Sequence, residues 1–225
     1  MNYSREDKIK QCVIVSLILL FVSALFTILV TKVDVSAIGP ESTKVGFSKL
    51  NGSVRDALPY NNICYLISKL LGLLALATVA FFAFLAFLQV ISRKGIFKAD
   101  KDLYVLGCFY VLVLLAYVIF EKLALNFRPI ILDEGLEASY PSSHTMLGIC
   151  VFITAAMQFK TRLADKNVRM IVIIACVALA VLLVVTRLLS GVHWFTDIIG
   201  GIIISSFLIS LYKLGFYAVF TGSKD

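Results

Sequence analysis

The chain contains only two histidines, and each lies in a short polar stretch at the edge of an apolar segment. His144 follows two serines in the run Pro-Ser-Ser-His, and His193 precedes Asp197 by four residues. Imidazole is the side chain best suited to act as a nucleophile or a proton donor near neutral pH. Polar groups are costly in a chain that is 60% hydrophobic unless they have partners or a task. We therefore interpret the two histidines as parts of one reaction centre.

The stretch around His193 combines an imidazole, a carboxylate and a guanidinium. His193 and Asp197 are four residues apart, so at the start of a helix they lie on the same side. An aspartate there can accept a hydrogen bond from one ring nitrogen and leave the other with a lone pair for attack. Arg187 lies six residues upstream of His193, and a guanidinium can bind two phosphate oxygens at once. An isolated histidine in this setting would more simply be held for packing, but the second histidine has supporting sequence of its own.

The residues before His144 are typical of the start of a helix, with Ser142 or Ser143 as the capping residue. The exposed backbone N–H groups and the dipole of such a helix end favour anions. A plain helix cap would explain the serines alone. With a histidine directly after them, the combination supplies phosphate donors and a proton donor together.

The apolar composition indicates the elements that must position these groups. A soluble domain of 225 residues could not bury so much apolar surface, so part of its solvent must be lipid. Segments that approach or exceed the ~20 residues needed to cross a bilayer, the fourth only marginally, are 11–30, 63–91, 103–125, 144–159, 168–189 and 197–220. The first is too long for the apolar core of a signal peptide, so we expect it to be retained. We predict an all-α membrane protein, with six transmembrane helices in one bundle and a single domain over residues 1–225.

The net charge of +7 follows the loops between these segments, and we do not interpret it as a sign of nucleic-acid binding. Basic residues gather before the first segment, between the second and third, and between the fourth and fifth: Arg5, Lys8, Lys10, Arg93, Lys94, Lys98, Lys101, Lys160, Arg162, Lys166 and Arg169. The positive-inside rule then places both termini in the cytoplasm. The first outer loop, about 31–62, departs from this trend with four basic residues, but three acidic residues share it. This topology puts Arg128, Arg187 and both histidines at the outer face, although the charge argument does not use the histidines.

Four other features have plainer interpretations. Hydrophobic positions between Val45 and Leu58 suggest short amphipathic pieces at the membrane interface, and a simple tether explains them equally well. Lys69 is interpreted as a snorkelling or ion-paired residue, and Trp194 as an anchor in the interfacial aromatic belt. The five scattered cysteines are interpreted as small buried residues.

Together, these stretches resemble the type 2 phosphatidic acid phosphatase superfamily of integral membrane lipid phosphatases. The signatures of that family are Lys-x6-Arg-Pro, Pro-Ser-Gly-His and Ser-Arg-x5-His-x3-Asp. The second is present with Ser143 in place of glycine, and the third is present with Thr186 in place of its serine. The first is incomplete, because Arg128 and the proline after it match, but Glu121 occupies the lysine position and Lys122 follows it. The motifs cover about residues 121–197.

The resemblance implies a phosphatase that forms a phosphohistidine intermediate. His193 would attack phosphorus while Asp197 holds its ring, and His144 would protonate the leaving group and then activate water. Phosphate binding would fall to backbone N–H groups and to Arg128, Arg187, Ser142, Ser143 and, in one account, Lys122. No cofactor and no metal is implied, and we interpret the remaining acidic residues nearby as loop charges: Asp133, Glu134 and Glu137.

Glu121 is the departure from the family pattern that bears on chemistry, because a carboxylate repels phosphate. Three accounts are open at this point. Lys122 substitutes for the missing lysine, although one residue along a helix is ~100° of rotation. Alternatively, Glu121 orients Arg128, or the chemistry of the site is weakened.

The resemblance implies an amphiphilic lipid substrate with a phosphate monoester or pyrophosphate head group. Undecaprenyl pyrophosphate, phosphatidic acid and phosphatidylglycerol phosphate all fit, with the tail between helices and membrane lipids as the surroundings. We expect a bacterial plasma membrane protein with its active site on the outer face. The alternatives are a lipid head-group phosphotransferase and a non-catalytic lipid-binding or transport relative. The sequence carries no sign of an oligomeric state.

Overall fold

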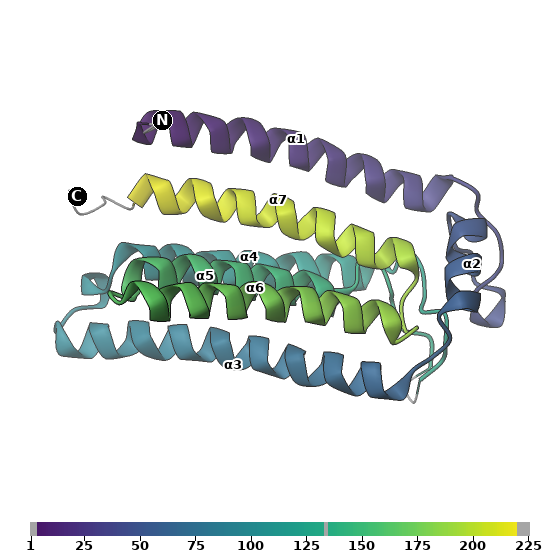
Figure 1. Cartoon of the computed structure of the whole chain (residues 1–225). Helices are drawn as coiled ribbons and strands as arrows, with labels where there is room; N and C mark the ends of the chain where they lie inside the picture. The colour runs from purple at the N-terminus through teal and green to yellow at the C-terminus, as the bar shows by residue number, and fades with distance from the viewer. Residues whose placement is uncertain (1–3, 133–134, 220–225) are drawn as a thin grey trace.

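The computed structural model describes residues 4–132 and 135–219 as α-helices joined by loops (Figure 1). In chain order the helices are α1 (Arg5–Lys32), α2 (Ser48–Ala57), α3 (Asn62–Ser92), α4 (Lys101–Leu123), α5 (Ser143–Arg162), α6 (Lys166–Leu189) and α7 (Phe195–Val219). Two short 3-10 turns lie in the loops, η1 (Pro40–Ser42) and η2 (Ile96–Lys98). Within the two described ranges, β-pairing is limited to isolated bridges. The prediction of an all-α protein is confirmed.

The long helices run alongside one another, whereas the short α2 lies across one end of the bundle (Figure 1). Helix α5 contacts α3, α4, α6 and α7, so it occupies the centre of the bundle. Helix α1 packs along α7 at the outside. The N-terminal end of α1 and the C-terminal end of α7 lie at the end of the bundle opposite to α2 (Figure 1).

Five of the described helices are long and apolar enough to cross a membrane: α1, α3, α4, α6 and α7. Large apolar side chains such as Phe21, Leu73 and Ile171 point outward and are more than half exposed. Exposed apolar surface on this scale requires a lipid environment. The chain is therefore a multi-pass membrane protein, with five spans supported by length and composition.

The sixth predicted span, 144–159, corresponds to α5, which is not among those five helices. Half of its 20 residues are buried, and they include the polar side chains of Thr145, Thr154 and Gln158. A helix enclosed by protein does not need an apolar exterior, because its neighbours and not lipid supply its surroundings. The enclosed position of α5 explains why its sequence is marginal as a span, and the count of six stays a prediction.

Helix α2 packs onto the bundle and is not a simple tether. The side chain of Asn51 is buried, and its Nδ2 donates to Oγ1 of Thr196 at 2.9 Å. Its Oδ1 accepts from the backbone N–H of Thr196 at 3.2 Å. The backbone N–H of Asn61 donates to the carbonyl of Ser190 at 3.1 Å. These bonds fix the segment between α1 and α3 over the start of α7 and the turn before it.

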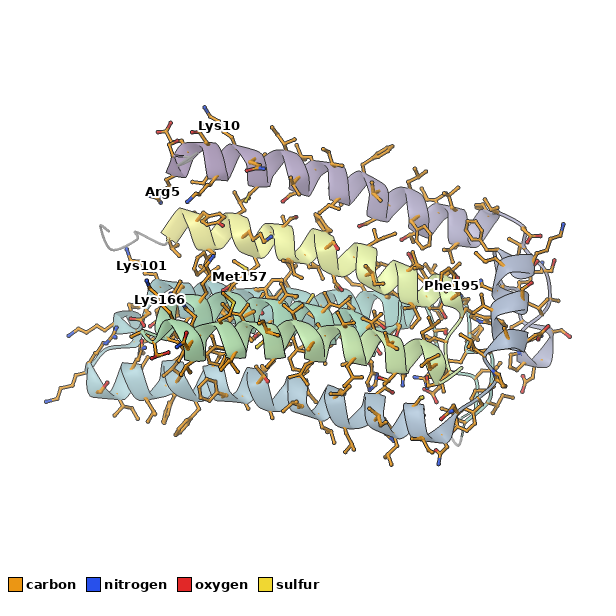
Figure 2. The ribbon with its side chains drawn as sticks, viewed as in Figure 1. Arg5, Lys10, Lys101, Met157, Lys166 and Phe195 are labelled. Atoms are coloured by element: carbon orange, nitrogen blue, oxygen red, sulfur yellow. The ribbon has the colours of Figure 1, made fainter. Side chains whose placement is uncertain are left out.

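The two ends of the bundle differ in charge. Figure 2 shows Arg5, Lys10, Lys101 and Lys166 at the end where the termini lie, with Phe195 toward the opposite end. At the basic end, Arg162 forms ion pairs with Asp100 at 3.2 Å and Asp102 at 2.8 Å. These bonds join α5 to the start of α4.

Candidate active site

His193 and Asp197 are linked through a serine hydroxyl. Asp197 lies in the first turn of α7, and its Oδ2 is 3.7 Å from Nδ1 of His193. The Oγ of Ser139 lies 3.0 Å from Nδ1 and 2.5 Å from Oδ2. All three residues are buried. The direct hydrogen bond that the four-residue spacing predicts is therefore replaced by a link through Ser139.

The carboxylate of Asp197 is held by groups from several segments. Nδ2 of Asn126 donates to its Oδ1 at 2.9 Å, and the backbone N–H of Trp194 donates to its Oδ2 at 2.9 Å. The backbone carbonyl of Asp197 accepts a hydrogen bond from the backbone N–H of Ser142 at 3.1 Å, and this bond ties α7 to the start of α5. Because Asp197 is fully buried, these donors compensate for the hydration that its carboxylate loses.

The loop between α4 and α5 brings Ser139 and Asn126 to this carboxylate. The backbone N–H of Ser139 donates to the carbonyl of Asn126 at 3.0 Å, and that of Arg128 donates to the carbonyl of Glu137 at 3.0 Å. This short antiparallel pairing folds the loop back on itself. Neither Ser139 nor Asn126 was predicted from the sequence, although Asn126 lies within the first signature and Ser139 lies just before the second. A small polar residue two positions before Pro141 is the only signal that the sequence offers for Ser139.

Trp194 is part of the same packing, so its interpretation as an interfacial anchor is wrong. The residue is only 1% exposed, and its Nε1 donates to the carbonyl of Phe127 at 2.7 Å. The guanidinium of Arg55 on α2 lies over its ring, 5.6 Å from the ring centroid. Trp194 therefore fastens the turn that carries His193 to the loop that carries Ser139.

The second ring nitrogen of His193 faces a guanidinium. Nη2 of Arg187 lies 3.1 Å from Nε2 of His193. Because a guanidinium only donates, Nε2 must be the acceptor, and the ring proton lies on Nδ1. Nδ1–H then donates to Ser139, whose hydroxyl donates to the carboxylate of Asp197. The lone pair of His193 is thus on Nε2, directed at Arg187.

Burial and positive charge keep His193 neutral. Burial is the largest cause that lowers its pKa, followed by the charges of Arg187 and Arg128, and the pKa lies well below its usual value. The hydrogen bond with Ser139 opposes this shift. A neutral imidazole with a lone pair on Nε2 is the form that attacks an electrophile.

The two arginines of the signatures have different partners. Arg187, in the last turn of α6, is 1% exposed, and its Nη1 lies 3.4 Å from Oγ of Ser68 on α3. Nη2 of Arg128 pairs with Oε2 of Glu137 at 2.8 Å. The carboxylate that holds Arg128 is therefore that of Glu137, and the structure does not support the account in which Glu121 orients it.

His144 lies in the first turn of α5 and faces α3. The prediction that a helix starts here is confirmed, with Ser142 as the N-cap residue and Ser143 as the first helical residue. A Cβ atom added at Gly72 of α3 would lie 2.9 Å from Cδ2 of His144. The absence of a side chain at Gly72 therefore makes room for the imidazole.

Several buried donors around the two histidines have no hydrogen-bond partner within the described residues. They belong to all three signatures: Nε of Arg128, Oγ of Ser142 and Nε of Arg187. Buried polar atoms normally find partners, because leaving one unpaired costs about 1–3 kcal/mol. Three unpaired donors from separate segments are suited to an oxyanion with several oxygens.

Two adjoining cavities reach the histidines. The larger, about 620 Å³, lies between α3, α4 and α5, and Lys69, Ser143 and His144 line it together with apolar residues of those helices. Glu121, Ser139 and His193 line the smaller one. The two cavities share Tyr117, Ser143 and Met146 in their walls.

The structure brings together all the predicted site residues except Lys122. That residue is exposed near the end of α4 and lines neither of the two cavities, so it does not replace the missing lysine. Glu121 itself is exposed but takes part in the wall of the smaller cavity. In residues 4–132 and 135–219, no three His, Cys, Asp or Glu side chains gather as a metal site would require. Asp133 and Glu134 lie outside the described residues, and Glu137 pairs with Arg128.

The fold and the site define a helical, multi-pass membrane protein with a buried imidazole–hydroxyl–carboxylate chain beside two arginines. Residues 127–220 match the family model of the PAP2 superfamily, a stretch that contains both histidines, Asp197 and both arginines. This part of the chain is therefore similar to the PAP2 superfamily.

Two relatives come from Bacillus subtilis. Phosphatidylglycerophosphatase B of strain 168 is 34% identical over 95 residues, which are 41% of this chain and 45% of that protein, so the match spans less than half the length of this relative. The crystal structure of a transmembrane PAP2-type phosphatidylglycerolphosphate phosphatase superposes with a TM-score of 0.63. It covers 88% of this chain and 94% of the other at 18% identity, which shows a shared fold.

Proposed function

We propose that this protein is a membrane lipid phosphatase that hydrolyses a phosphate monoester or pyrophosphate head group through a phosphohistidine. The observation that carries the proposal is the state of His193. Its Nδ1 is tied through Ser139 to a buried carboxylate, while its Nε2 lone pair lies 3.1 Å from Nη2 of Arg187. The carboxylate orients the imidazole through Nδ1, and the guanidinium lies beside the lone pair on Nε2. This arrangement suits attack of the imidazole on phosphorus.

In the first step, Nε2 of His193 forms a bond to phosphorus, and the bond from phosphorus to the leaving oxygen breaks. His144, in its protonated form, gives a proton to that oxygen. The imidazole of His193 becomes positively charged as it attacks. The link through Ser139 to Asp197 stabilises that charge, because a hydrogen-bond chain that ends on a carboxylate strengthens as its donor becomes cationic.

In the second step, His144 accepts a proton from water, and the water oxygen attacks the phosphohistidine. The bond from phosphorus to Nε2 breaks, which releases inorganic phosphate and restores neutral His193. Throughout both steps the unpaired donors of Arg128, Arg187 and Ser142 supply hydrogen bonds for the non-bridging oxygens. Arg187 already lies where the phosphoryl group arrives, so it needs only a small shift from Nε2.

The larger cavity supports a lipid as the substrate. Its wall is apolar along α3 and α4, with residues such as Leu73, Leu76 and Leu114, and it becomes polar only near His144. A lipid tail in this cavity would place its head group at the imidazole. Undecaprenyl pyrophosphate, phosphatidic acid and phosphatidylglycerol phosphate are the candidates, and the name of the curated relative favours the last.

We place the protein in a bacterial plasma membrane, with six spans, both termini in the cytoplasm and the site at the outer face. The support is the position of Arg5, Lys10, Lys101 and Lys166 at the end of the bundle opposite to Phe195, which lies two residues after His193 (Figure 2). We also propose that no metal is needed, because the arginines supply the positive charge. Full activity after treatment with EDTA is the expected result.

The test is release of inorganic phosphate from these three lipids by purified wild type, His193→Ala and His144→Ala. His193→Ala should lower kcat by more than about a thousandfold, because it removes the nucleophile. Replacement of an outward-facing residue of α6 that lines neither cavity, Ile171→Ala, serves as the control and should leave kcat within about twofold. Phosphate release that survives His193→Ala would overturn the mechanism, and a new phosphorylated product without release of phosphate would indicate a transferase.

A further inference from the structure

Lys69 is an exposed cation in the N-terminal third of α3, a candidate membrane-spanning helix, and it lines the larger cavity together with His144. Among the residues that the structure describes, no carboxylate lies within 4.0 Å of its ammonium group. Its contact is the ring of Tyr65, whose centroid lies 5.2 Å from Nζ. The described residues therefore give no support to an ion pair at Lys69, and the snorkelling alternative stays a prediction. A charge that lacks a counter-ion within a transmembrane helix marks a site of function.

The face of α3 that carries Lys69 is the face toward the catalytic residues. Gly72, three residues along, faces the imidazole of His144, and Ser68 lies 3.4 Å from Nη1 of Arg187. The ring of Tyr65 also lies under the guanidinium of Arg187, 5.6 Å from its Cζ. Residues three or four apart share one side of a helix. Lys69 therefore lies in the wall of the larger cavity, with its side chain exposed.

The order of groups along the two cavities separates Lys69 from the nucleophile. His193 lines the smaller cavity, whereas Lys69 and His144 line the larger one, which continues as an apolar space. In the proposed mechanism, phosphorus at His193 would put the leaving oxygen near His144. The next group of the substrate toward the tail would then lie in the larger cavity, whose wall contains Lys69.

We propose that Lys69 binds a second phosphate of the substrate, located between the scissile bond and the lipid tail. This inference rests on the proposed function and deepens it, because it makes Lys69 a determinant of substrate class. The second phosphate is the inner phosphate of a lipid diphosphate or the phosphodiester of phosphatidylglycerol phosphate. Phosphatidic acid has no such group, since its leaving group is a neutral diacylglycerol.

The chemistry of the leaving group explains why a cation is useful at this position. When a diphosphate is cleaved, negative charge develops on the leaving phosphate, and an ammonium group beside it stabilises that charge. Lysine is a compact point charge on a flexible stem, which suits phosphates at slightly different distances from the scissile bond. Arg187 and Arg128 act on the transferred phosphoryl group and leave the second phosphate to Lys69.

The test compares kcat/KM of wild type, Lys69→Gln and Lys69→Arg on farnesyl diphosphate, phosphatidylglycerol phosphate and phosphatidic acid in detergent micelles. Lys69→Gln should lose at least about tenfold on a substrate that carries a second phosphate and less than about threefold on phosphatidic acid. Lys69→Arg should recover most of the loss. The matched control is Lys122→Gln, which removes an exposed lysine that lines neither cavity and should leave all three rates unchanged.

The pattern across substrates decides the outcome. A loss confined to farnesyl diphosphate or to phosphatidylglycerol phosphate supports the proposal and identifies the source of the second phosphate. An equal loss on all three substrates, or no loss on any, overturns it, because Lys69 then acts on the transferred phosphate, on folding or on neither. If wild type releases phosphate from none of them, the proposed function itself fails, and this result is distinct from an active enzyme that is insensitive to Lys69.

Discussion

At the scale of single residues, the site depends on a hydroxyl that no signature contains. Ser139 replaces the direct contact between His193 and Asp197, whose nearest atoms are 3.7 Å apart. A hydroxyl can accept from the imidazole and donate to the carboxylate at the same time. It therefore fixes the tautomer of His193 as well as the orientation of its ring. Ser139 is a positioning residue, because it acts through His193.

Removal of this hydroxyl should slow the chemistry without weakening substrate binding. Ser139→Ala leaves Nδ1 of His193 and one oxygen of Asp197 without their shared partner, so we expect kcat to fall about 10- to 100-fold with KM within about twofold. Phosphate release under saturating lipid measures the effect. The control is Ser205→Ala, which removes a buried hydroxyl that donates to backbone carbonyls of α5 and α7 and has no contact with His193 or Asp197 among the hydrogen bonds of the described residues. A normal kcat for Ser139→Ala would show that Asp197 acts on His193 without the hydroxyl.

The depressed pKa of His193 gives a second prediction at this scale. Burial and the charges of Arg187 and Arg128 disfavour the imidazolium, so the folded protein should keep this ring neutral as the pH falls from 7.5 to 5.5. The unfolded chain binds a proton near pH 6.5, so stability contributed by neutral His193 is present above that pH and is lost as the pH falls below it.

Nitrogen NMR of protein labelled with 15N-histidine checks this directly, because the chain contributes only two imidazoles. His144→Gln assigns the remaining signal to His193. We expect chemical shifts of a neutral, Nδ1-protonated ring at both pH values. Conversion to an imidazolium between pH 7.5 and 5.5 would contradict the account of its charge.

Sequence spacing could reveal the residues that lie within one segment. His193, Asp197 and Arg187 stand at fixed offsets around one turn, so their types and spacing alone indicated a common site. Ser139 and Asn126 join that site only through the folding of a loop. Long-range backbone bonds determine their positions, and such bonds have no counterpart in a local pattern.

At the scale of elements, the start of α5 could be predicted from its local sequence, whereas its burial depends on neighbouring helices. Its residues are less apolar than those of the other long helices, and half of them are buried by neighbours. The start of this helix was predictable from the serines before His144. Its enclosure was not, because the contacts come from α3, α6 and α7.

The packing of α5 on α3 makes Gly72 a sensitive position. A methyl group there would lie 2.9 Å from Cδ2 of His144, so Gly72→Ala must push the ring or separate the helices. We expect kcat/KM to fall by about tenfold or more, in line with the effect of small misplacements of catalytic groups. The control is Gly107→Ala on α4, where an added Cβ meets nothing within 4 Å. Thermal unfolding of both variants checks that the fold is retained, and unchanged activity of Gly72→Ala would mean that His144 is not confined by α3.

At the scale of the whole molecule, charge and chemistry lie at opposite ends of the bundle. The basic residues of the loops gather at the end where the termini lie, and α2 covers the end that contains His193 (Figures 1 and 2). The charge pattern of the sequence predicted this separation, because loop charges report which ends of successive helices lie together. The sequence did not predict that α2 packs over the turn before α7, because an amphipathic stretch fits a membrane surface and a protein surface equally well.

The orientation of this bundle in the membrane can be measured with cysteine labelling in intact cells. In a variant that lacks the five native cysteines, Lys44→Cys introduces an exposed thiol in the loop between α1 and α2, and Lys166→Cys introduces one at the start of α6. Because basic loops are retained in the cytoplasm, a membrane-impermeant maleimide should label Lys44→Cys from outside and Lys166→Cys only after permeabilisation. Retained phosphate release confirms that each variant is folded. The reverse labelling pattern would place His193 on the cytoplasmic side, where its lipid substrate would have to be drawn from the inner leaflet.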